Sequence, residues 1–163
     1  MITFIKSSIS IIVLSLIYLI SCSTTNAKTI ANPIKNLAKA EVISVTTSGK
    51  ENSYTFSIGI KSPDLGCKQY ANWWEVVSED GKLIYRRILG HSHVNEQPFV
   101  RSGGKVKITK DQIVIIRAHM NTSGYGVKAY RGSVNNGFKT YLLNKDFATV
   151  LENKKPLPSG CAF

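Results

Sequence analysis

Three histidines are the side chains of this chain best suited to bind a transition metal. His91 and His93 are two residues apart, so on an extended strand both imidazoles point to the same side. Together with His119, and with Glu96 or Met120 nearby, they could form a zinc or copper site. The alternative is that they form structural hydrogen bonds, because nothing in the sequence brings His119 to the other two. We favour the structural role and predict no resident metal.

Other catalytic patterns are missing from the sequence. It contains no P-loop, no G-x-G-x-x-G, no G-x-S-x-G and no H-E-x-x-H, so nucleotide binding, serine hydrolysis and zinc proteolysis have no motif. Glu75 and Glu79 are the closest pair of glutamates, but Glu75 faces Arg86 across a predicted hairpin, which argues against a two-carboxylate glycosidase site. We therefore expect a non-catalytic protein without a cofactor.

The amino-terminal segment predicts export from the cytoplasm. Residues 1–6 carry one positive charge, and the apolar run 9–20 that follows is too short for a typical membrane-spanning helix of ~20 residues. Leu19-Ile20-Ser21-Cys22 resembles the lipobox of bacterial lipoproteins. An ordinary secretory signal is the alternative, but Leu19 suits its cleavage site poorly.

The lipobox resemblance implies that the Cys22 thiol is alkylated by a diacylglyceryl group and that the signal peptide, residues 1–21, is cut off before it. In that class an Asp after the cysteine tends to retain the protein in the inner membrane, whereas Ser23 implies the outer membrane. Residues 22–40 are polar and contain Lys but no acid, which is typical of a tether. We expect a lipid-anchored protein of the cell envelope, with the membrane as its first partner.

Two further cysteines, Cys67 and Cys161, remain once Cys22 is assigned to lipid. An exported compartment is oxidising, so we predict a disulfide between them. A metal site or a catalytic thiol pair is the alternative, but the short C-x-x-C spacing of such sites is absent.

The chain is strongly basic, with 21 Lys plus Arg against 10 Asp plus Glu in 163 residues. The Lys and Arg side chains of an exported protein could bind an anionic envelope polymer or an acidic protein partner rather than nucleic acid. The alternative is a solubilising surface that also discourages pairing of sheet edges. The candidate anion-binding residues on predicted strands or their edges are Arg86, Arg87, Arg101, Lys105, Lys107, Arg117 and Arg131.

Short segments of alternating polarity, separated by turn-forming residues, must position these side chains. Asp80-Gly81 is the clearest hairpin signal and places Trp74 opposite Arg87. The segment 144–153 has helical spacing of its apolar residues. The predicted strands are Val42–Thr47, Tyr54–Ile60, Trp73–Ser78, Lys82–Leu89, Lys105–Thr109, Ile113–Met120 and Val127–Val134.

These elements predict an all-β domain over residues 41–163, an antiparallel β-sandwich of the immunoglobulin-like kind with one short C-terminal helix. A small β-barrel is the alternative. The stretch from Tyr70 through Gly104 resembles uncharacterised exported bacterial proteins, and that resemblance carries no activity to this chain.

Overall fold

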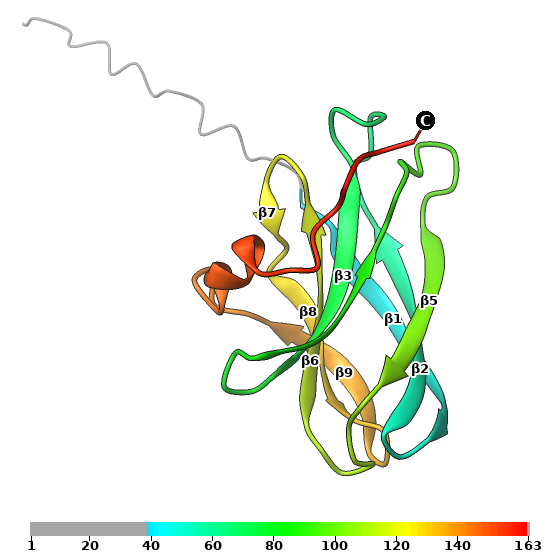
Figure 1. The fold of residues 1–163 in the computed structure, drawn as a ribbon, viewed down its shortest axis with the longest axis vertical. Coiled ribbons are helices and arrows are strands. Elements are labelled where there is room, and N and C mark those ends of the chain that lie inside the picture. Colours follow the sequence, from blue (N-terminus) through cyan, green and yellow to red (C-terminus); the bar gives the residue numbers. More distant parts are fainter. Residues whose placement is uncertain (1–38, 163) are drawn as a thin grey trace, which may run out of the picture. The chain divides into compact units, whose positions relative to one another are not determined.

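The computed structural model describes residues 39–162, and within this range the regular secondary structure is almost entirely β-strand (Figure 1). A single 3-10 helix, η1 (Thr149–Asn153), follows the last strand. No helix in this range is long and apolar enough to cross a membrane. The strands are β1 (Glu41–Lys50), β2 (Ser53–Lys61), β3 (Ala71–Ser78), β4 (Leu83–Ile88), β5 (Phe99–Val106), β6 (Val114–Met120), β7 (Gly124–Tyr125), β8 (Lys128–Ser133) and β9 (Gly137–Leu142).

The strands form two antiparallel sheets packed face to face. The first has the order β1-β2-β5, and the second has the order β4-β3-β6-β8-β9 with β7 paired to β6. These orders correspond to strands A-B-E and C′-C-F-G of immunoglobulin domains, with β9 as an addition beside the last strand. The predicted antiparallel, immunoglobulin-like sandwich is therefore confirmed.

The core lies between the two sheets and follows from the period-two alternation of the strands. On β2 the side chains of Phe56, Ile58 and Ile60 are fully buried, and on β6 those of Val114 and Ile116 face them across the interface. The central strands β3 and β6 are buried along almost their whole length. Their outer faces must therefore be covered as well, and the segment after β9 packs there.

Two predicted elements differ from the structure. The strand expected at 105–109 lies earlier, at β5, and β9 has no counterpart among the predicted strands. β8 ends before Asn135-Asn136-Gly137, which forms the turn to β9, with Gly137 at a φ of 74°. The expected helix over 144–153 shrinks to η1 because Ala148 adopts a left-handed conformation with a φ of 47°.

Candidate functional site

Three connections meet at one end of the sandwich, which we call the loop end. They are the β2–β3 loop (62–70), the β4–β5 loop (89–98) and the β6–β7 turn (121–123), and they lie at the top of Figure 1. Tyr70 N–H donates to Asn121 Oδ1 at 2.9 Å and so connects the first loop to the turn. In immunoglobulin domains the corresponding loops form a binding surface, so the loop end is the first place to search for a site.

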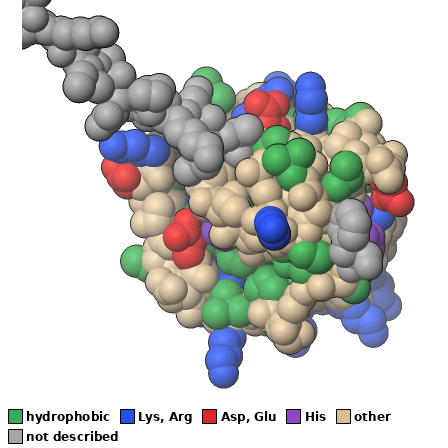
Figure 2. Space-filling view, turned by 90° about the horizontal axis from the view of Figure 1, so that it is seen from above, with side chains coloured by type: hydrophobic (Ala, Val, Ile, Leu, Met, Phe, Trp, Pro, Cys, Tyr) green, Lys and Arg blue, Asp and Glu red, His purple; other side chains and the backbone are tan. Residues whose placement is uncertain are grey.

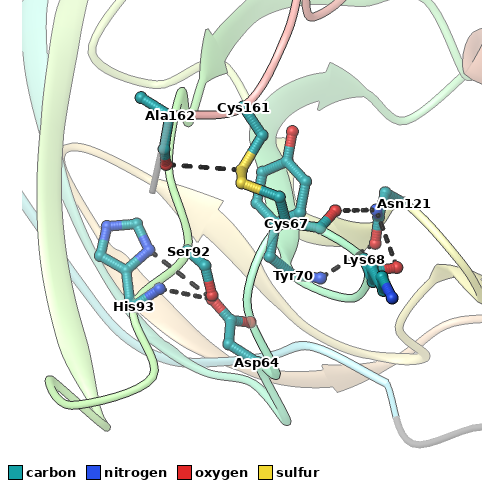
Figure 3. Close-up of a disulfide and its surroundings, with 9 residues drawn as sticks. All are labelled: Asp64, Cys67, Lys68, Tyr70, Ser92, His93, Asn121, Cys161 and Ala162. Carbon is teal, nitrogen blue, oxygen red and sulfur yellow. Dashed lines mark hydrogen bonds and ion pairs between the residues drawn. A yellow bond between two sulfur atoms is a disulfide. The ribbon is translucent and has the colours of Figure 1, made fainter.

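Asp64 joins the first two loops. Its side chain is buried, and its carboxylate accepts hydrogen bonds from Ser62 Oγ at 2.7 Å and Ala71 N–H at 2.9 Å. It also accepts from His93 N–H at 2.8 Å (Figure 3). Ser92 Oγ adds a fourth, at 3.4 Å. With both oxygens occupied by donors of the protein itself, Asp64 fixes the loops and is not placed to accept a substrate proton. The sequence signal for this role was Pro63-Asp64 in a turn, which sequence reasoning missed.

A disulfide closes the loop end. Cys67 and Cys161 are joined with a Cα–Cα distance of 5.6 Å, which confirms the predicted pair. Asn121 Nδ2 donates to the carbonyls of Cys67 and Lys68, so the turn and the disulfide brace the same loop (Figure 3). Ala162 N–H donates to the carbonyl of Gly90 at 2.8 Å. The tail of the chain is thereby held against the β4–β5 loop.

His91 and His93 lie together in that loop, as their spacing predicts. Their ring centroids are 4.4 Å apart, and the buried His93 ring stacks on Phe99 at 3.7 Å. Burial, with a further contribution from the Arg101 charge, lowers the pKa of His93 to about 4. His93 is therefore neutral at pH 7, and its contact with Asp64, 3.8 Å from Nδ1 to Oδ2, is not an ion pair.

His119 lies on a different face of the molecule. It projects from the outer face of the second sheet, where its ring stacks on Trp73 at 3.7 Å and its Nδ1 is 2.7 Å from Asn72 Oδ1. His93, by contrast, packs on Phe99, which belongs to the core between the sheets. Burial and the charges of Arg86 and Arg117 lower the pKa of His119 to about 3.

The alternative hypothesis of a metal site formed by all three histidines is therefore wrong. His119 is on β6, and β3 separates that strand from β4, the strand that leads into the loop with His91 and His93. Within residues 39–162 no group of three or more His, Cys, Asp or Glu side chains is arranged to hold a metal ion.

The outer face of the second sheet also contains a buried ionic cluster. Glu75 faces Arg86 in the hairpin register, as predicted, and its carboxylate accepts from Arg86 Nε at 2.8 Å and from Arg117 Nε at 2.9 Å. All three side chains are almost completely inaccessible to solvent. One carboxylate thus neutralises part of the charge of two guanidinium groups on neighbouring strands.

The remaining donors of the two arginines hold the chain segment after β9. Arg86 donates to the carbonyls of Leu151, Lys154 and Pro156, at 2.7, 2.5 and 3.0 Å. Arg117 donates to the carbonyls of residues 147 and 148 at 2.6 and 2.9 Å. We call residues 147–156 the strap, because these bonds hold it across β3 and β6.

The structure thus divides the seven candidate anion-binding residues. Arg86 and Arg117 are buried and bound to Glu75, so neither is available to a ligand. Arg131 is paired with Glu79. The remaining four lie on or beside the edge strands β4 and β5, and we call them the basic edge: Arg87, Arg101, Lys105 and Lys107.

Most of the basic edge is free of acidic partners. Arg87 Nε donates to the carbonyl of Ser102 at 3.3 Å, which brings it beside β5. Lys105 and Lys107 are exposed, and within residues 39–162 neither they nor Arg87 form an ion pair. Arg101 is paired with Glu96 at 2.5 Å. Cys22, the predicted lipidation site, lies outside the described residues, as do segment 1–21 and residues 22–38 of the expected tether.

Comparison with known proteins gives one similar protein. A chain of Halomicrobium mukohataei described as "Putative lipoprotein" is 33% identical over 108 residues, which are 66% of this chain and 53% of that protein. This chain thus spans about half the length of that relative. No family model matches the sequence, and the comparison with solved structures found no match. The description of that relative as a lipoprotein names no activity.

Proposed function

We propose that this protein is a lipid-anchored component of the cell envelope whose sandwich domain binds an anionic envelope component without catalysing a reaction. The anchor is supported by the lipobox-like residues ending in Cys22 and by the description of the similar protein. Ser23 supports location in the outer membrane. The observation that carries the binding role is the basic edge, because Lys105, Lys107 and Arg87 are held at the surface without a neutralising carboxylate.

The buried acids support binding rather than catalysis. Glu75 accepts hydrogen bonds from two arginines, and Asp64 accepts from two backbone amides and two hydroxyl groups. Both carboxylates therefore stabilise the fold. The charges that remain accessible are mainly cations on the surface, which attract polyanions over a distance that salt limits to about 10 Å at 0.1 M.

The anchor is tested on the protein purified from membranes. Mass spectrometry of its amino-terminal peptide should find Cys22 as the first residue, carrying acyl groups, and Cys22→Ser should move the protein out of the membrane fraction. Density-gradient separation of the two membranes tests the outer-membrane location. An unmodified Cys22, or cleavage at another residue, contradicts the anchor.

The binding role is tested on residues 22–163 with Cys22→Ser, using immobilised lipopolysaccharide as the polyanion. Lys105→Glu with Lys107→Glu should weaken binding by about twentyfold, on the scale of about fivefold for each lysine lost near an anionic surface. The matched control is Lys139→Glu with Lys145→Glu, two exposed lysines outside the basic edge. Equal losses in both double variants indicate diffuse charge attraction and contradict a site at the basic edge.

A further inference from the structure

The tip of the β2–β3 loop holds a leucine in solvent. Leu65 is 72% exposed. Its N–H donates to the carbonyl of Gln69 at 2.7 Å, and Gln69 Nε2 donates to the carbonyl of Pro63 at 2.6 Å. Cys67, two residues further along, carries the disulfide. The turn is thus rigidly braced while its largest apolar side chain contributes little to the core, which is typical of an interaction site.

A second exposed aliphatic side chain lies on the neighbouring loop. Val94 is 40% exposed and directly follows His93, whose N–H donates to Asp64, the residue before Leu65. Figure 2 looks down on the molecule from above, the side of the loop end in Figure 1, and shows apolar side chains reaching the surface among lysines and arginines. The loop end therefore presents rigidly held apolar side chains from two connected loops.

The charges around these side chains are mainly positive. Lys61 and Lys68, at the two sides of the braced turn, are exposed. The acids of the two loops are Asp64, which is 5% exposed, and Glu96, whose charge is paired with Arg101. An apolar tip surrounded by lysines is the composition of surfaces that bind anionic lipid headgroups.

The polypeptide enters the domain at this same end. Lys39 Nζ donates to the carbonyl of Ser123 in the β6–β7 turn. Lys39 and Lys61 line an open hollow of about 250 Å³ whose one acidic lining residue, Glu41, is paired with Lys128 at 2.9 Å. This hollow is large enough for a phosphate group and has two lysines in its wall.

The tether alone does not determine how the domain lies on a membrane. Sixteen residues, 23–38, separate Cys22 from Lys39, and a chain of that length reaches at most ~60 Å. A sandwich built from strands of about ten residues is only ~30 Å long in the strand direction. The domain could therefore lie in any orientation unless one of its surfaces binds the bilayer.

We propose that the loop end is a membrane-docking surface, in which Leu65 and Val94 enter the headgroup region of the bilayer while Lys61, Lys68 and Lys39 contact lipid phosphates. The biological location of this contact rests on the proposed anchor. Docking fixes the domain upright, so that the β1–β2 hairpin at the opposite end points away from the membrane. The acyl chains retain the protein, and the loop end orients it.

The test uses residues 22–163 with Cys22→Ser and an oxidised disulfide, so that no acyl chain contributes. Flotation should show binding to vesicles of phosphatidylcholine and phosphatidylglycerol, and much weaker binding to phosphatidylcholine alone. Leu65→Asp should weaken this binding by about tenfold, the value expected for losing one buried leucine side chain. The matched control is Val150→Asp, because Val150 is 77% exposed and lies on η1, outside the β2–β3 and β4–β5 loops.

The charge contribution is tested with paired double variants. Lys61→Glu with Lys68→Glu should weaken vesicle binding by about twentyfold, whereas Lys105→Glu with Lys107→Glu on the basic edge should weaken it by less than about threefold. Equal losses in the two double variants, or equal losses in Leu65→Asp and Val150→Asp, overturn the docking surface. Absence of binding to the anionic vesicles overturns it as well.

A spectroscopic variant covers the case in which Leu65→Asp disturbs the fold. In Leu65→Trp the added indole should shift its emission to shorter wavelength when anionic vesicles are added, and in Val150→Trp it should not. An unshifted Leu65→Trp spectrum with vesicle-bound protein excludes insertion of this tip. Because this protein lacks acyl chains, failure here leaves the anchor test on Cys22 unaffected, and failure of the anchor leaves these results valid.

Discussion

Glu75 forms ion pairs with two arginines, Arg86 and Arg117, more than any other acid in the described part of the chain. It is fully buried and faces two guanidinium groups, whose other donors are used on strap carbonyls. Removing the carboxylate would leave two buried guanidinium charges that contact neither water nor an acid, and this lowers the stability of the folded state. Trp73, whose ring lies 4.4 Å from the Arg86 guanidinium carbon, adds only a weaker attraction.

We therefore expect Glu75→Gln to lower the free energy of unfolding by about 3 to 5 kcal/mol, because it removes the negative charge and keeps the shape. Urea denaturation followed by tryptophan fluorescence measures this. The control is Glu79→Gln, which removes an exposed ion pair with Arg131 and should cost less than about 1 kcal/mol. A similar loss in both variants would show that the buried cluster adds nothing beyond a surface pair.

The two buried histidines predict loss of stability in mild acid. The pKa of His93 is lowered to about 4 and that of His119 to about 3, against 6.5 when the chain is unfolded. Below pH 6.5 the unfolded chain binds these protons and the folded protein does not, so stability is complete above 6.5 and falls continuously until the folded pKa values are reached.

Between about pH 7 and pH 5 each of these histidines should contribute a loss of about 2 kcal/mol. Denaturation curves at the two pH values give the difference. His119→Gln should remove about half of the pH dependence, whereas replacing the exposed His91 by Gln should change it far less. A pH dependence that is the same in all three proteins would assign the acid sensitivity to other groups.

The β3–β4 hairpin shows how one element supports another. Its turn residue Gly81 has a φ of 81°, a conformation that other residues rarely adopt, and a Cβ there would lie 3.2 Å from the Cβ of Ala148 in the strap. The hairpin and the strap are thus in contact at a position where a side chain is excluded. Asp80-Gly81 in the sequence predicts the turn, but it gives no sign of the strap above it.

Gly81→Ala should therefore destabilise the protein by about 1 to 2 kcal/mol, the cost of a left-handed conformation for a residue with a Cβ. Thermal unfolding followed by circular dichroism is the measurement. Gly90→Ala is the control, because its φ is ordinary and no atom lies within 4 Å of the added carbon. A neutral Gly81→Ala would mean that the turn can rearrange freely.

Local sequence patterns predict those elements whose two faces differ. The alternation in β2 and the hairpin around Asp80-Gly81 are both present in the structure, and so is the pairing of Glu75 with Arg86. β9 was missed because most of its side chains are exposed, so polar and apolar residues do not alternate along it. The strap could not be predicted, because five backbone carbonyls bound by two distant arginines leave no trace in the local pattern.

The candidate site was predictable only in part for a similar reason. The number of cysteines was sufficient to predict the disulfide. The spacing of His91 and His93 was sufficient to predict that their rings lie together. The position of His119 depends on which strands are neighbours, and sequence does not give the order of strands in a sheet. The composition gives the net charge of the protein. It does not show that Arg86 and Arg117 are buried and so differ from the exposed residues of the basic edge.

At the scale of the whole molecule, the disulfide joins the first loop of the sandwich to the end of the tail, 94 residues apart. Replacing Cys67 and Cys161 by Ser should lower the free energy of unfolding by about 2 to 4 kcal/mol, chiefly because the unfolded chain regains the freedom of a long loop. Calorimetric unfolding of the variant and the oxidised protein gives the difference. Equal midpoints would mean that the strap and the sheets alone hold the tail.

The disulfide also determines how the domain responds to mechanical force. A pull between residues 39 and 162 passes from Cys67 directly to Cys161, so the 93 residues between them carry no load. Only β1, β2 and the start of the next loop can be drawn out, about 28 residues or ~100 Å of extended chain. The seven strands β3 to β9 and the strap lie behind this covalent link and carry none of the force, so the disulfide sets a limit to how far the domain can be stretched.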